Sequence, residues 1–348
     1  MIDTRKIRVG DIYIGGSEDV IIQSMTNTNT ADVVATVAQI KELEALGCQL
    51  VRVTVNSVEA ASAIKEIKKE ISIPLVADIH FDYKLAILAI ENGIDKLRIN
   101  PGNIGSDEKV KLVVEKAKEY NIPIRIGVNG GSLEKEILKK YGKVTPEALV
   151  ESGMYHIRLL EKYDFENIII SLKASNVKIM RKAYQLIKEK IDYPLHLGVT
   201  EAGTYFSGSI KSAIGIGSLL LDGIGDTIRV SLTEDPTEEI GVAKEILRVL
   251  EIGEKGTEIV SCPTCGRTEI NLIELAKKVE AKFANHGKDI KIAVMGCVVN
   301  GPGEAREADY GVAGGKGVGV LFKKGQVVKT VNEGEILEEL EKMIREDD

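Results

Sequence analysis

Residues 50–79 carry the sequence LVRVTVNSVEAASAIKEIKKEISIPLVADI. Two short apolar and β-branched runs, 50–55 and 75–79, flank residues 58–70, where apolar side chains recur at helical spacing. A strand, a helix and a second strand in so short a stretch predict a βαβ unit, which joins two parallel strands. This unit decides the fold, because the same alternation recurs over the first three quarters of the chain.

Eight strand candidates alternate with helical patterns between about residues 20 and 249. We expect strands at 20–24, 50–55, 75–79, 96–99, 124–128, 168–172, 195–199 and 227–231, with helices including 31–46, 58–70, 84–92, 106–120 and 177–190. This repeat predicts an α/β fold, a (β/α)8 TIM barrel. A doubly wound open sheet is the alternative, but no Gly-x-Gly-x-x-Gly turn follows the first strand.

The segments outside this repeat predict a hairpin and a second domain. Residues 7–14 are expected to form a small hairpin that closes the bottom of the barrel. We divide the chain into a TIM barrel, 1–253, and a small α+β domain, 254–348, joined by a short linker at 251–256. In the second domain, residues 318–322 and 327–331 predict a β-hairpin, with the glycines of 311–317 at its entry turn.

Composition narrows the function classes. The 348 residues are 44% hydrophobic, which is ordinary for a globular protein with a substantial core. A net charge of -7 and the absence of Trp argue against a nucleic-acid-binding surface. We find neither a signal peptide nor an apolar run long enough for a membrane span, so the chain is predicted to be cytoplasmic.

Several predicted strands carry cations where a barrel strand should be apolar. Arg52-Val53-Thr54, Arg98-Ile99-Asn100 and Arg229-Val230-Ser231 repeat one pattern, a cation, an apolar residue and a small polar residue. Other strands place polar groups with the same period of two, which puts them on one face: Asp78 and His80, Arg125 and Asn129, and Ser171 and Lys173.

Buried cations need partners, because an unpaired buried Arg costs several kcal/mol. They could pair with carboxylates as stabilising networks, or bind an anionic ligand. Most of them fall near the carboxyl ends of the strands, where barrel active sites are built. Arg suits phosphate oxygens, so we favour a di- or polyphosphorylated small molecule. Glu201, just beyond the seventh strand, is a candidate general acid or base.

The cysteines indicate a metal centre in the last quarter of the chain. Cys262 and Cys265 lie in Ser-Cys-Pro-Thr-Cys-Gly-Arg, and Cys297 opens Cys-Val-Val-Asn-Gly-Pro-Gly-Glu, which ends at Glu304. Three thiols leave one ligand missing, and Glu304 is the candidate. Cys48 lies far upstream and is expected to be a buried, inert thiol.

The nature of this centre has three interpretations. A disulfide is disfavoured in a chain without a secretory signal. Zinc would need a second close pair of thiols or nearby histidines. Three thiolates with one weakly held carboxylate suit an iron–sulfur cluster better, and zinc is the alternative that the spacing leaves open.

These motifs resemble a known family. The two cysteine motifs, behind a barrel that opens with Gln23-Ser24-Met25-Thr26-Asn27-Thr28, closely resemble bacterial 4-hydroxy-3-methylbut-2-enyl diphosphate synthases of the methylerythritol phosphate pathway. The resemblance covers essentially the whole chain. It implies a 4Fe-4S cluster, a homodimer and reductive ring opening with dehydration of 2-C-methyl-D-erythritol 2,4-cyclodiphosphate.

The resemblance also assigns residues. The cluster ligands would be Cys262, Cys265, Cys297 and Glu304, with Glu304 exchangeable during catalysis and Glu201 as the catalytic acid. The diphosphate would be held by Arg52, Arg98, Arg125, Lys173, Arg229 and Ser231, and the polyol by Asp78, His80 and Asn129.

Partners follow from the same resemblance. Flavodoxin or ferredoxin would supply electrons. In a head-to-tail homodimer each cluster domain would cap the partner's barrel, because the short linker cannot easily fold it over its own. No nucleic-acid or membrane partner is expected. The competing hypotheses are a different iron–sulfur enzyme on a barrel, and a non-redox phosphate-binding barrel with a zinc-stabilised tail.

Overall fold

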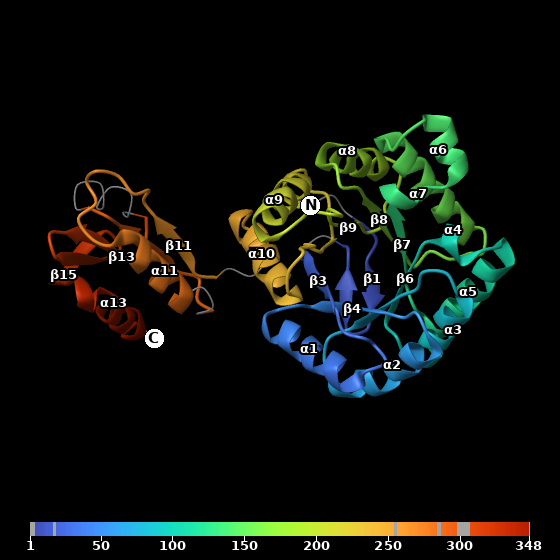
Figure 1. Ribbon diagram of the computed structural model, residues 1–348, viewed down its shortest axis with the longest axis horizontal. Coiled ribbons are helices and arrows are strands. Elements are labelled where there is room, and N and C mark those ends of the chain that lie inside the picture. Colours follow the sequence, from blue (N-terminus) through green and yellow to red (C-terminus); the bar gives the residue numbers. More distant parts are fainter. Residues whose placement is uncertain (1–3, 17–18, 254–255, 284–286, 298–306, 348) are drawn as a thin grey trace. The chain divides into compact units, whose positions relative to one another are not determined.

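The computed structural model describes residues 4–16, 19–253, 256–283, 287–297 and 307–347. The chain forms two compact units, Met1–Gly253 and Glu254–Asp348. The first is a ring of parallel strands surrounded by helices (Figure 1). Around the ring the strands are β8 (Ile168–Lys173), β7 (Ile124–Asn129), β6 (Lys96–Ile99), β5 (Leu75–Asp78), β4 (Leu50–Thr54), β3 (Ile21–Met25), β10 (Thr227–Ile228) and β9 (His196–Leu197). A parallel bridge between Ile170 and Leu195 closes the ring, so the predicted (β/α)8 barrel is confirmed.

Each barrel strand is followed by one or more helices on the outside of the ring. In chain order these are α1 (Val33–Ala45), α2 (Val58–Glu70), α3 (Tyr83–Glu91), α4 (Pro101–Ile104), α5 (Asp107–Tyr120), α6 (Lys135–Tyr141), α7 (Pro146–Glu161), α8 (Val177–Lys188), α9 (Tyr205–Leu221) and α10 (Pro236–Val249). Side-chain caps fix several helix starts. Ser57 accepts a hydrogen bond from Ala60 N at the start of α2, and Asp82 accepts one from Lys84 N at the start of α3.

The strands divide their side chains between two environments. Residues such as Val53 and Leu97 point outward and join the apolar core under the helices. Their neighbours in sequence point into the ring, since successive strand residues face opposite sides. The inward positions therefore form a separate interior, and the predicted site residues of the strands lie there.

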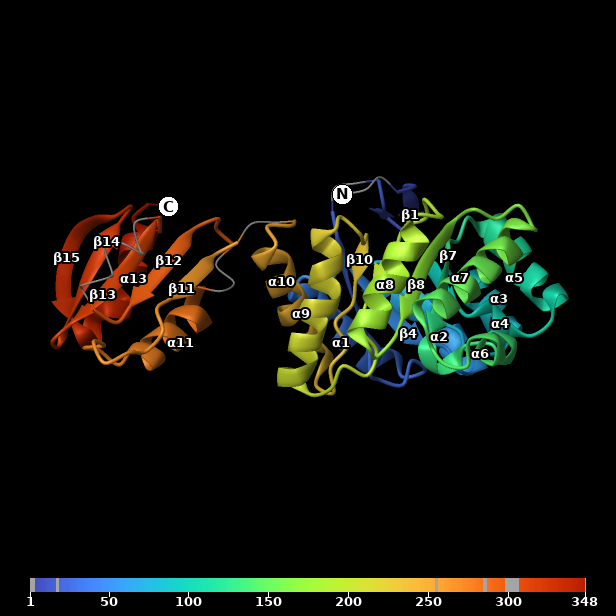
Figure 2. The same ribbon diagram turned by 90° about the horizontal axis from the view of Figure 1, so that it is seen from above.

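A hairpin closes the amino end of this interior. Strands β1 (Ile7–Val9) and β2 (Ile12–Ile14) pair antiparallel. Ile7, Val9 and Ile14 pack with residues at the starts of barrel strands, namely Ile21, Leu50, Val76 and Ile169. In Figure 2, β1 lies at the end of the barrel opposite α6. The hairpin predicted to close the bottom of the barrel is confirmed.

The second unit is a five-stranded mixed sheet. Its strands lie in chain order, β11 (Glu258–Ser261), β12 (Lys291–Met295), β13 (Tyr310–Gly315), β14 (Val318–Lys323) and β15 (Gln326–Asn332). The first three pair in parallel and the last three antiparallel. Ile292 and Val294 of β12 pack with residues of α11 (Leu272–Phe283) and α13 (Ile336–Arg345), so these helices cover one face.

The hairpin predicted in this unit is confirmed as β14 and β15, and Gly317 lies in the turn before it with a φ of 70°, but the other glycines of 311–317 have another role. Gly311, Gly314 and Gly315 lie within β13 and not in an entry turn. A Cβ atom at Gly311 would lie 2.2 Å from the Phe322 ring of the neighbouring strand. The missing side chain therefore makes room for that ring, a packing requirement that glycine spacing alone does not reveal.

Candidate active site

Cross-strand register gathers the barrel cations. Asp78 on β5 is directly opposite Arg98 on β6, and Arg98 is opposite Arg125 on β7. Neighbouring residues in register point to the same side of a sheet, so all three point into the ring. The period of two in the sequence thus becomes a row of charged groups across three strands.

Asp78 is the centre of an ion-pair network. Its Oδ1 lies 3.0 Å from Arg98 Nη1 and its Oδ2 lies 3.6 Å from Arg52 Nε. His80 Nε2 lies 3.9 Å from the same carboxylate. Burial raises the pKa of Asp78, but the charges of Arg52 and Arg98 outweigh this effect and lower the pKa to about 2. Asp78 is therefore a carboxylate at neutral pH that holds two guanidinium groups in place.

A second carboxylate, Glu239 of α10, orients Arg229. Glu239 is buried and lies 3.3 Å from Arg229 through both Nε and Nη2. It also accepts hydrogen bonds from Ser24 Oγ and Leu232 N. Such a bidentate contact fixes the plane of a guanidinium group. The network interpretation thus holds for part of the cationic set.

Arg125 and Lys173 are buried cations without a carboxylate partner. Among the described residues, neither Arg125 nor Lys173 forms an ion pair. Arg125 donates from Nη1 to Ser171 Oγ at 2.6 Å, while its Nε and Nη2 are buried without a partner. A buried unpaired cation is costly, so these groups indicate a site for an anion.

Two glycines make room for this set. A Cβ atom at Gly127 of β7 would lie 2.5 Å from Arg98 Nε, and one at Gly198, just after β9, would lie 2.7 Å from Lys173 Nζ. Both distances are too short for a real side chain, so any larger residue would displace a cation. The anion site therefore requires glycine at both positions. The sequence alone did not indicate this requirement.

The remaining predicted residues lie at the carboxyl end of the strands. Asn129 ends β7, and with its amide oriented to satisfy both groups its oxygen accepts a hydrogen bond from Arg98 Nη2 at 3.2 Å. Ser231 is half-buried beyond β10, and His80 is exposed beyond β5. Glu201 is exposed beyond β9, with a φ of 53°. A left-handed conformation is uncommon for a residue other than glycine.

The second unit brings two of the predicted thiols to neighbouring strand ends. Cys262 directly follows β11 and Cys297 lies two residues after β12, which pairs in parallel with β11. The amide of Gly296 donates to Cys262 Sγ at 3.2 Å. Cys265 is exposed, and hydrogen bonds from Arg267 lower the pKa of its thiol. Glu304 lies outside the described residues.

These thiols have the chemistry that an iron–sulfur cluster requires. Amide hydrogen bonds to sulfur and a lowered thiol pKa both favour the thiolate, which is the ligand form. Within the described part of the chain, however, no three His, Cys, Asp or Glu side chains are close enough to hold a metal ion. The donor set therefore fits such a centre in chemistry and in placement at the strand ends, without a preformed cage.

Comparison with known families decides the identity. Residues 4–244 match the family described as the GcpE TIM-barrel domain, and residues 258–346 match the GcpE protein C-terminal domain. The chain belongs to the GcpE family. A GcpE relative from Fusobacterium nucleatum subsp. nucleatum is 70% identical over 99% of this chain and 98% of its own length, and one from Clostridium perfringens is 62% identical over 98% of each. Both are named 4-hydroxy-3-methylbut-2-en-1-yl diphosphate synthase (flavodoxin).

The family predicted from the motifs is therefore confirmed, and with it the prediction that this GcpE chain is an enzyme. Solved structures support the fold alone. The dihydropteroate synthase of Yersinia pestis has a TM-score of 0.51 at 10% identity, covering 71% of this chain and 98% of its own. The 3-dehydroquinate dehydratase of Geobacillus kaustophilus has a TM-score of 0.52 at 16% identity, covering 72% and 98%.

Three residues of the charged interior were not predicted from the sequence of this GcpE chain. Glu239 orients Arg229, as described above. Met25 Sδ lies 2.8 Å from Arg52 Nη2 and 3.6 Å from Arg229 Nη1, so it separates these two cations. Lys96 begins β6 and is fully buried. The period of two through Lys96 and Arg98 could have indicated Lys96, whereas no sequence signal links Glu239 or Met25 to the site.

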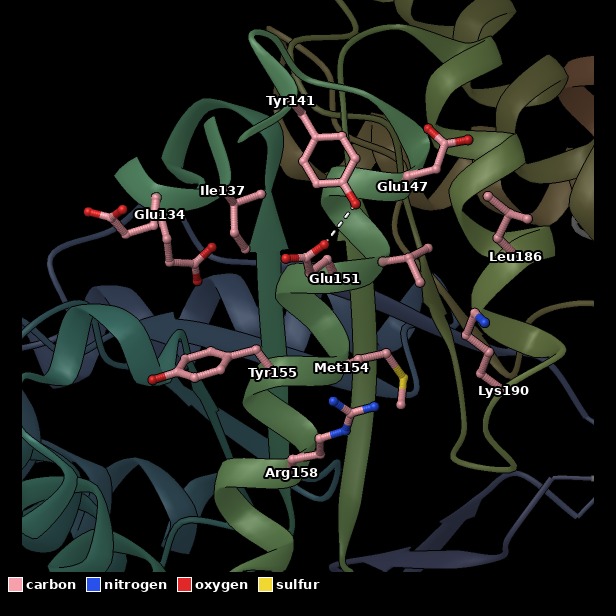
Figure 3. A pocket seen from close by; sticks show the side chains of 12 residues that line it. Glu134, Ile137, Tyr141, Glu147, Glu151, Met154, Tyr155, Arg158, Leu186 and Lys190 are labelled. Carbon is pink, nitrogen blue, oxygen red and sulfur yellow. Dashed lines mark hydrogen bonds between the residues drawn. The ribbon is translucent and has the colours of Figure 1, made fainter. Parts of the chain in front are cut away.

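A surface groove of about 1190 Å³ lies elsewhere, along α6, α7 and α8 (Figure 3). None of the predicted site residues lines it. Its carboxylates include Glu134, Glu147 and Glu151, and Tyr141 donates a hydrogen bond to Glu151 at 2.7 Å. So many carboxylates do not suit a multiply charged anion, and the groove is not a candidate for the substrate site. Among the described residues, no helix combines the length and apolar character needed to cross a bilayer.

Proposed function

We propose that this GcpE chain converts 2-C-methyl-D-erythritol 2,4-cyclodiphosphate to 4-hydroxy-3-methylbut-2-enyl diphosphate. The observation that carries the proposal is the presence of buried cations without carboxylates, among them Arg125 and Lys173, beside the network of Asp78. A cyclic diphosphate brings the negative charge that this interior lacks. The names of the relatives identify the product as a diphosphate.

The reaction balances with two electrons and one proton. The C–O bond to one phosphoryl group and the bond to one hydroxyl group break, a carbon–carbon double bond forms, and water leaves. Side chains cannot supply single electrons to carbon, so the reaction needs a redox cofactor and a donor. Flavodoxin, which stands in the relatives' names, is the proposed donor, with ferredoxin as the alternative.

Binding is assigned to the charged interior of the barrel. Arg52, Arg98, Arg125, Lys173, Arg229 and Ser231 would hold the diphosphate. Several of these groups are already oriented, since Asp78 holds Arg52 and Arg98, and Glu239 holds Arg229. Such pre-orientation lowers the cost of ordering the site and stabilises charge that develops on the departing phosphoryl oxygen. The exposed end of the site, with His80, Asn129 and Asp78 beside it, would contact the polyol.

A 4Fe-4S cluster would be held by Cys262, Cys265, Cys297 and Glu304. When bound, it would supply single electrons and one iron able to accept a substrate oxygen. The hydrogen bond from Gly296 N to Cys262 and those from Arg267 to Cys265 stabilise the thiolates for this role. Glu304 lies outside the described residues, and its role as the exchangeable ligand rests on the sequence motif.

Glu201 would donate the proton to the departing hydroxyl oxygen. Its backbone is fixed in a left-handed turn, and the turn is tied to the next loop by a hydrogen bond from Thr233 N to Gly203 O at 2.9 Å. Lys211 Nζ contacts the carbonyl oxygen of Glu201 at 3.5 Å. These contacts hold Glu201 beyond the carboxyl end of β9, on the side of the barrel where active sites are built, and its position supports the role of proton donor.

A homodimer with composite sites completes the proposal, each cluster unit capping the partner's barrel. An apolar stripe on α9 supports a second copy as partner. Phe206, Ile210, Ile214 and Leu221 are 78%, 46%, 58% and 75% exposed, and their spacing places them on one side of the helix. A stripe of this kind on a barrel helix is typical of an interaction surface. We also propose that the enzyme works in the cytoplasm.

The test is anaerobic purification followed by visible absorption, iron and zinc analysis, and turnover of the cyclodiphosphate with an artificial reductant. Brown protein with about four irons per chain and reductant-dependent product is expected. Colourless zinc protein that binds diphosphates without turnover would overturn the redox function and leave a phosphate-binding barrel. Turnover without added reductant would contradict the proposed electron balance.

A further inference from the structure

Lys96 is buried in the barrel without a partner. It is the first residue of β6 and is 0% exposed. Leu97 packs in the core outside the strands, so Lys96 points into the ring on the same side as Arg98. Its Nζ has no hydrogen-bond partner among the described residues. Lys96 is opposite Val76, one of the residues that pack against the closing hairpin, so it lies below the row of Asp78 and Arg98.

Other unsatisfied polar atoms lie close enough to Lys96 to interact with it electrostatically, on Arg125 and on His196. The Nε and Nη2 of Arg125 and the Nε2 of His196 are buried and unpartnered. His196 is 0% exposed, and its Nδ1 is 2.7 Å from Thr227 Oγ1. Buried polar groups are normally hydrogen-bonded, so such a concentration requires an explanation. Donors dominate the group, which indicates that what is missing is an acceptor.

Lys96 differs from the arginines of the interior because it can lose its proton. The interior contains more cations than carboxylates. The charged and titratable groups around Lys96 are Arg52 on β4, Asp78 on β5, Arg98 on β6, Arg125 on β7, Lys173 on β8, His196 on β9, and Arg229 beyond β10 with Glu239 on α10. Arginine does not lose its proton in proteins, so an interior without an anion can reduce its charge only at lysine.

The environment of Lys96 favours this neutral form. Burial lowers the pKa of Lys96 well below its usual value, and the charges of Arg125 and Arg52 lower it further. No carboxylate contacts its Nζ to oppose these effects. The pKa of Lys173 is lowered by the same causes, burial first, but Lys173 belongs to the proposed contact set of the ligand.

We propose that Lys96 forms a second, deeper level of the anion site, neutral in the empty barrel and protonated from solution when the cyclic diphosphate binds above it. The amine takes up one proton and no bond of the ligand changes. This inference rests on the proposed function, because the cyclic diphosphate is the anion it invokes. Binding of substrate and uptake of a proton are then coupled, so each strengthens the other.

The coupling has a definite sign. Protonation of Lys96 accompanies binding, so affinity for the anion is highest at low pH. It decreases as the pH rises from the pKa that Lys96 has in the empty barrel to the higher pKa that it has in the complex. A cyclic diphosphate is suited to the measurement, since each of its phosphoryl groups carries a single strongly acidic proton. The ligand itself then exchanges no proton near neutral pH.

Isothermal titration calorimetry of the full chain tests this inference. The cyclodiphosphate and trimetaphosphate, a cyclic anion that is not a substrate, are titrated in PIPES, HEPES and Tris at one pH. The dependence of the heat on buffer gives the number of protons taken up. Three variants are compared: Lys96→Met removes the amine, Lys96→Arg keeps a permanent charge, and Lys111→Met removes an exposed lysine of α5.

The expected result is net proton uptake by the wild type that falls by about one proton in both Lys96 variants and is unchanged in Lys111→Met. Lys96→Met should weaken binding about tenfold, equivalent to one pKa unit of coupling, while Lys96→Arg should not. The agreement of the two variants in proton uptake, although one side chain is neutral and the other positively charged, excludes a folding defect as the cause.

Other outcomes separate this inference from the proposed function. Binding without proton uptake, or uptake that survives Lys96→Met, would overturn the role of Lys96 while leaving the substrate assignment intact. Trimetaphosphate binding with Lys96-dependent uptake, but no binding of the cyclodiphosphate, would support Lys96 and contradict the substrate. Failure to bind either anion would overturn both.

Discussion

The barrel interior and the cysteine turns differ in their exposure to solvent. In the barrel, Arg125 and Lys96 are fully enclosed by a ring of strands, and Asp78 holds neighbouring cations in fixed positions. In the second unit, Cys265 is exposed at the end of an open sheet. A site that binds an anion gains strength by excluding water. A centre that receives electrons has to remain within reach of a donor. We therefore expect that substrate binding and electron supply can each be removed by mutation without loss of the other.

The largest effect should come from Cys297→Ser, which removes a proposed cluster ligand. Visible absorption and turnover should both fall below detection, because the cluster would keep only two thiolates and the exchangeable Glu304. Binding of the cyclodiphosphate to the barrel, measured by calorimetry, should change by less than about twofold.

Cys48→Ala is the matched control for that variant. Cys48 is buried in the barrel, and burial raises the pKa of its thiol to about 11, so it is inert. This control should keep the absorption spectrum. Loss of anion binding in Cys297→Ser would contradict the independence of the two sites, since substrate binding would then depend on the cluster.

The next effect concerns catalysis at the barrel mouth. Glu201→Gln should lower kcat about 10²–10⁴-fold, the usual contribution of a general acid, with little change in substrate binding. Glu234→Gln, an exposed residue of the next loop, provides the control and should keep full activity. Steady-state kinetics checks both variants, and a Glu201→Gln enzyme with normal kcat would remove Glu201 from the mechanism.

A smaller effect is expected on stability of the barrel. Asp78→Asn leaves Arg52 and Arg98 without their shared carboxylate and should lower the free energy of unfolding by about 3 kcal/mol. Asp222→Asn, which breaks an exposed ion pair with Arg181, should cost no more than about 1 kcal/mol. Urea unfolding of the two variants measures the difference, and equal costs would contradict a preorganised interior.

The same carboxylate gives the wild type a pH dependence. Asp78 has a pKa of about 2 in the folded chain against an ordinary value of 3.8. Its contribution of about 2 kcal/mol is therefore present above pH 4 and is lost as the pH falls toward 2. Asp78→Asn should not show this loss, so the stability curves of variant and wild type should converge in acid.

The smallest predicted effect concerns assembly. Phe206→Asp places a charge in the apolar stripe of α9 and should weaken dimerisation by about 2 kcal/mol, the value of one buried aromatic side chain. Leu112→Asp on α5, which is 45% exposed, is the control. Sedimentation at several concentrations measures the dissociation constants. An equal effect of both variants would exclude α9 as the dimer surface.

Much of the fold could be predicted because its signals are local. Alternating strands and helices predict a barrel without knowledge of long-range contacts, and the period of two places Arg52 and Arg98 inside it. The least accurate elements are β9 and β10, where five-residue strands were expected and two residues each are paired, His196–Leu197 and Thr227–Ile228. Their continuations include Gly198, where a Cβ atom would clash with Lys173, and Arg229, which pairs with Glu239.

The rest of the site depends on contacts that no local pattern contains. Glu239 belongs to a helix after the last strand, and only the closed ring brings its carboxylate to Arg229. Met25 ends β3, and its contact with Arg52 on the next strand cannot be recognised from the sequence. Lys96 follows the visible period, but its lack of a partner appears only when every neighbour is known.

The closing hairpin of β1 and β2 has a consequence for how ligands arrive. Its apolar layer, with Ile7 and Ile14, forms a low-dielectric wall across one end of the charged interior. The electric field of the buried cations cannot spread into water there and is directed out of the open mouth. Anions approaching from that side are accelerated and cations are repelled. Association of the substrate should therefore slow with rising ionic strength, and a magnesium complex of it should approach more slowly than the free anion.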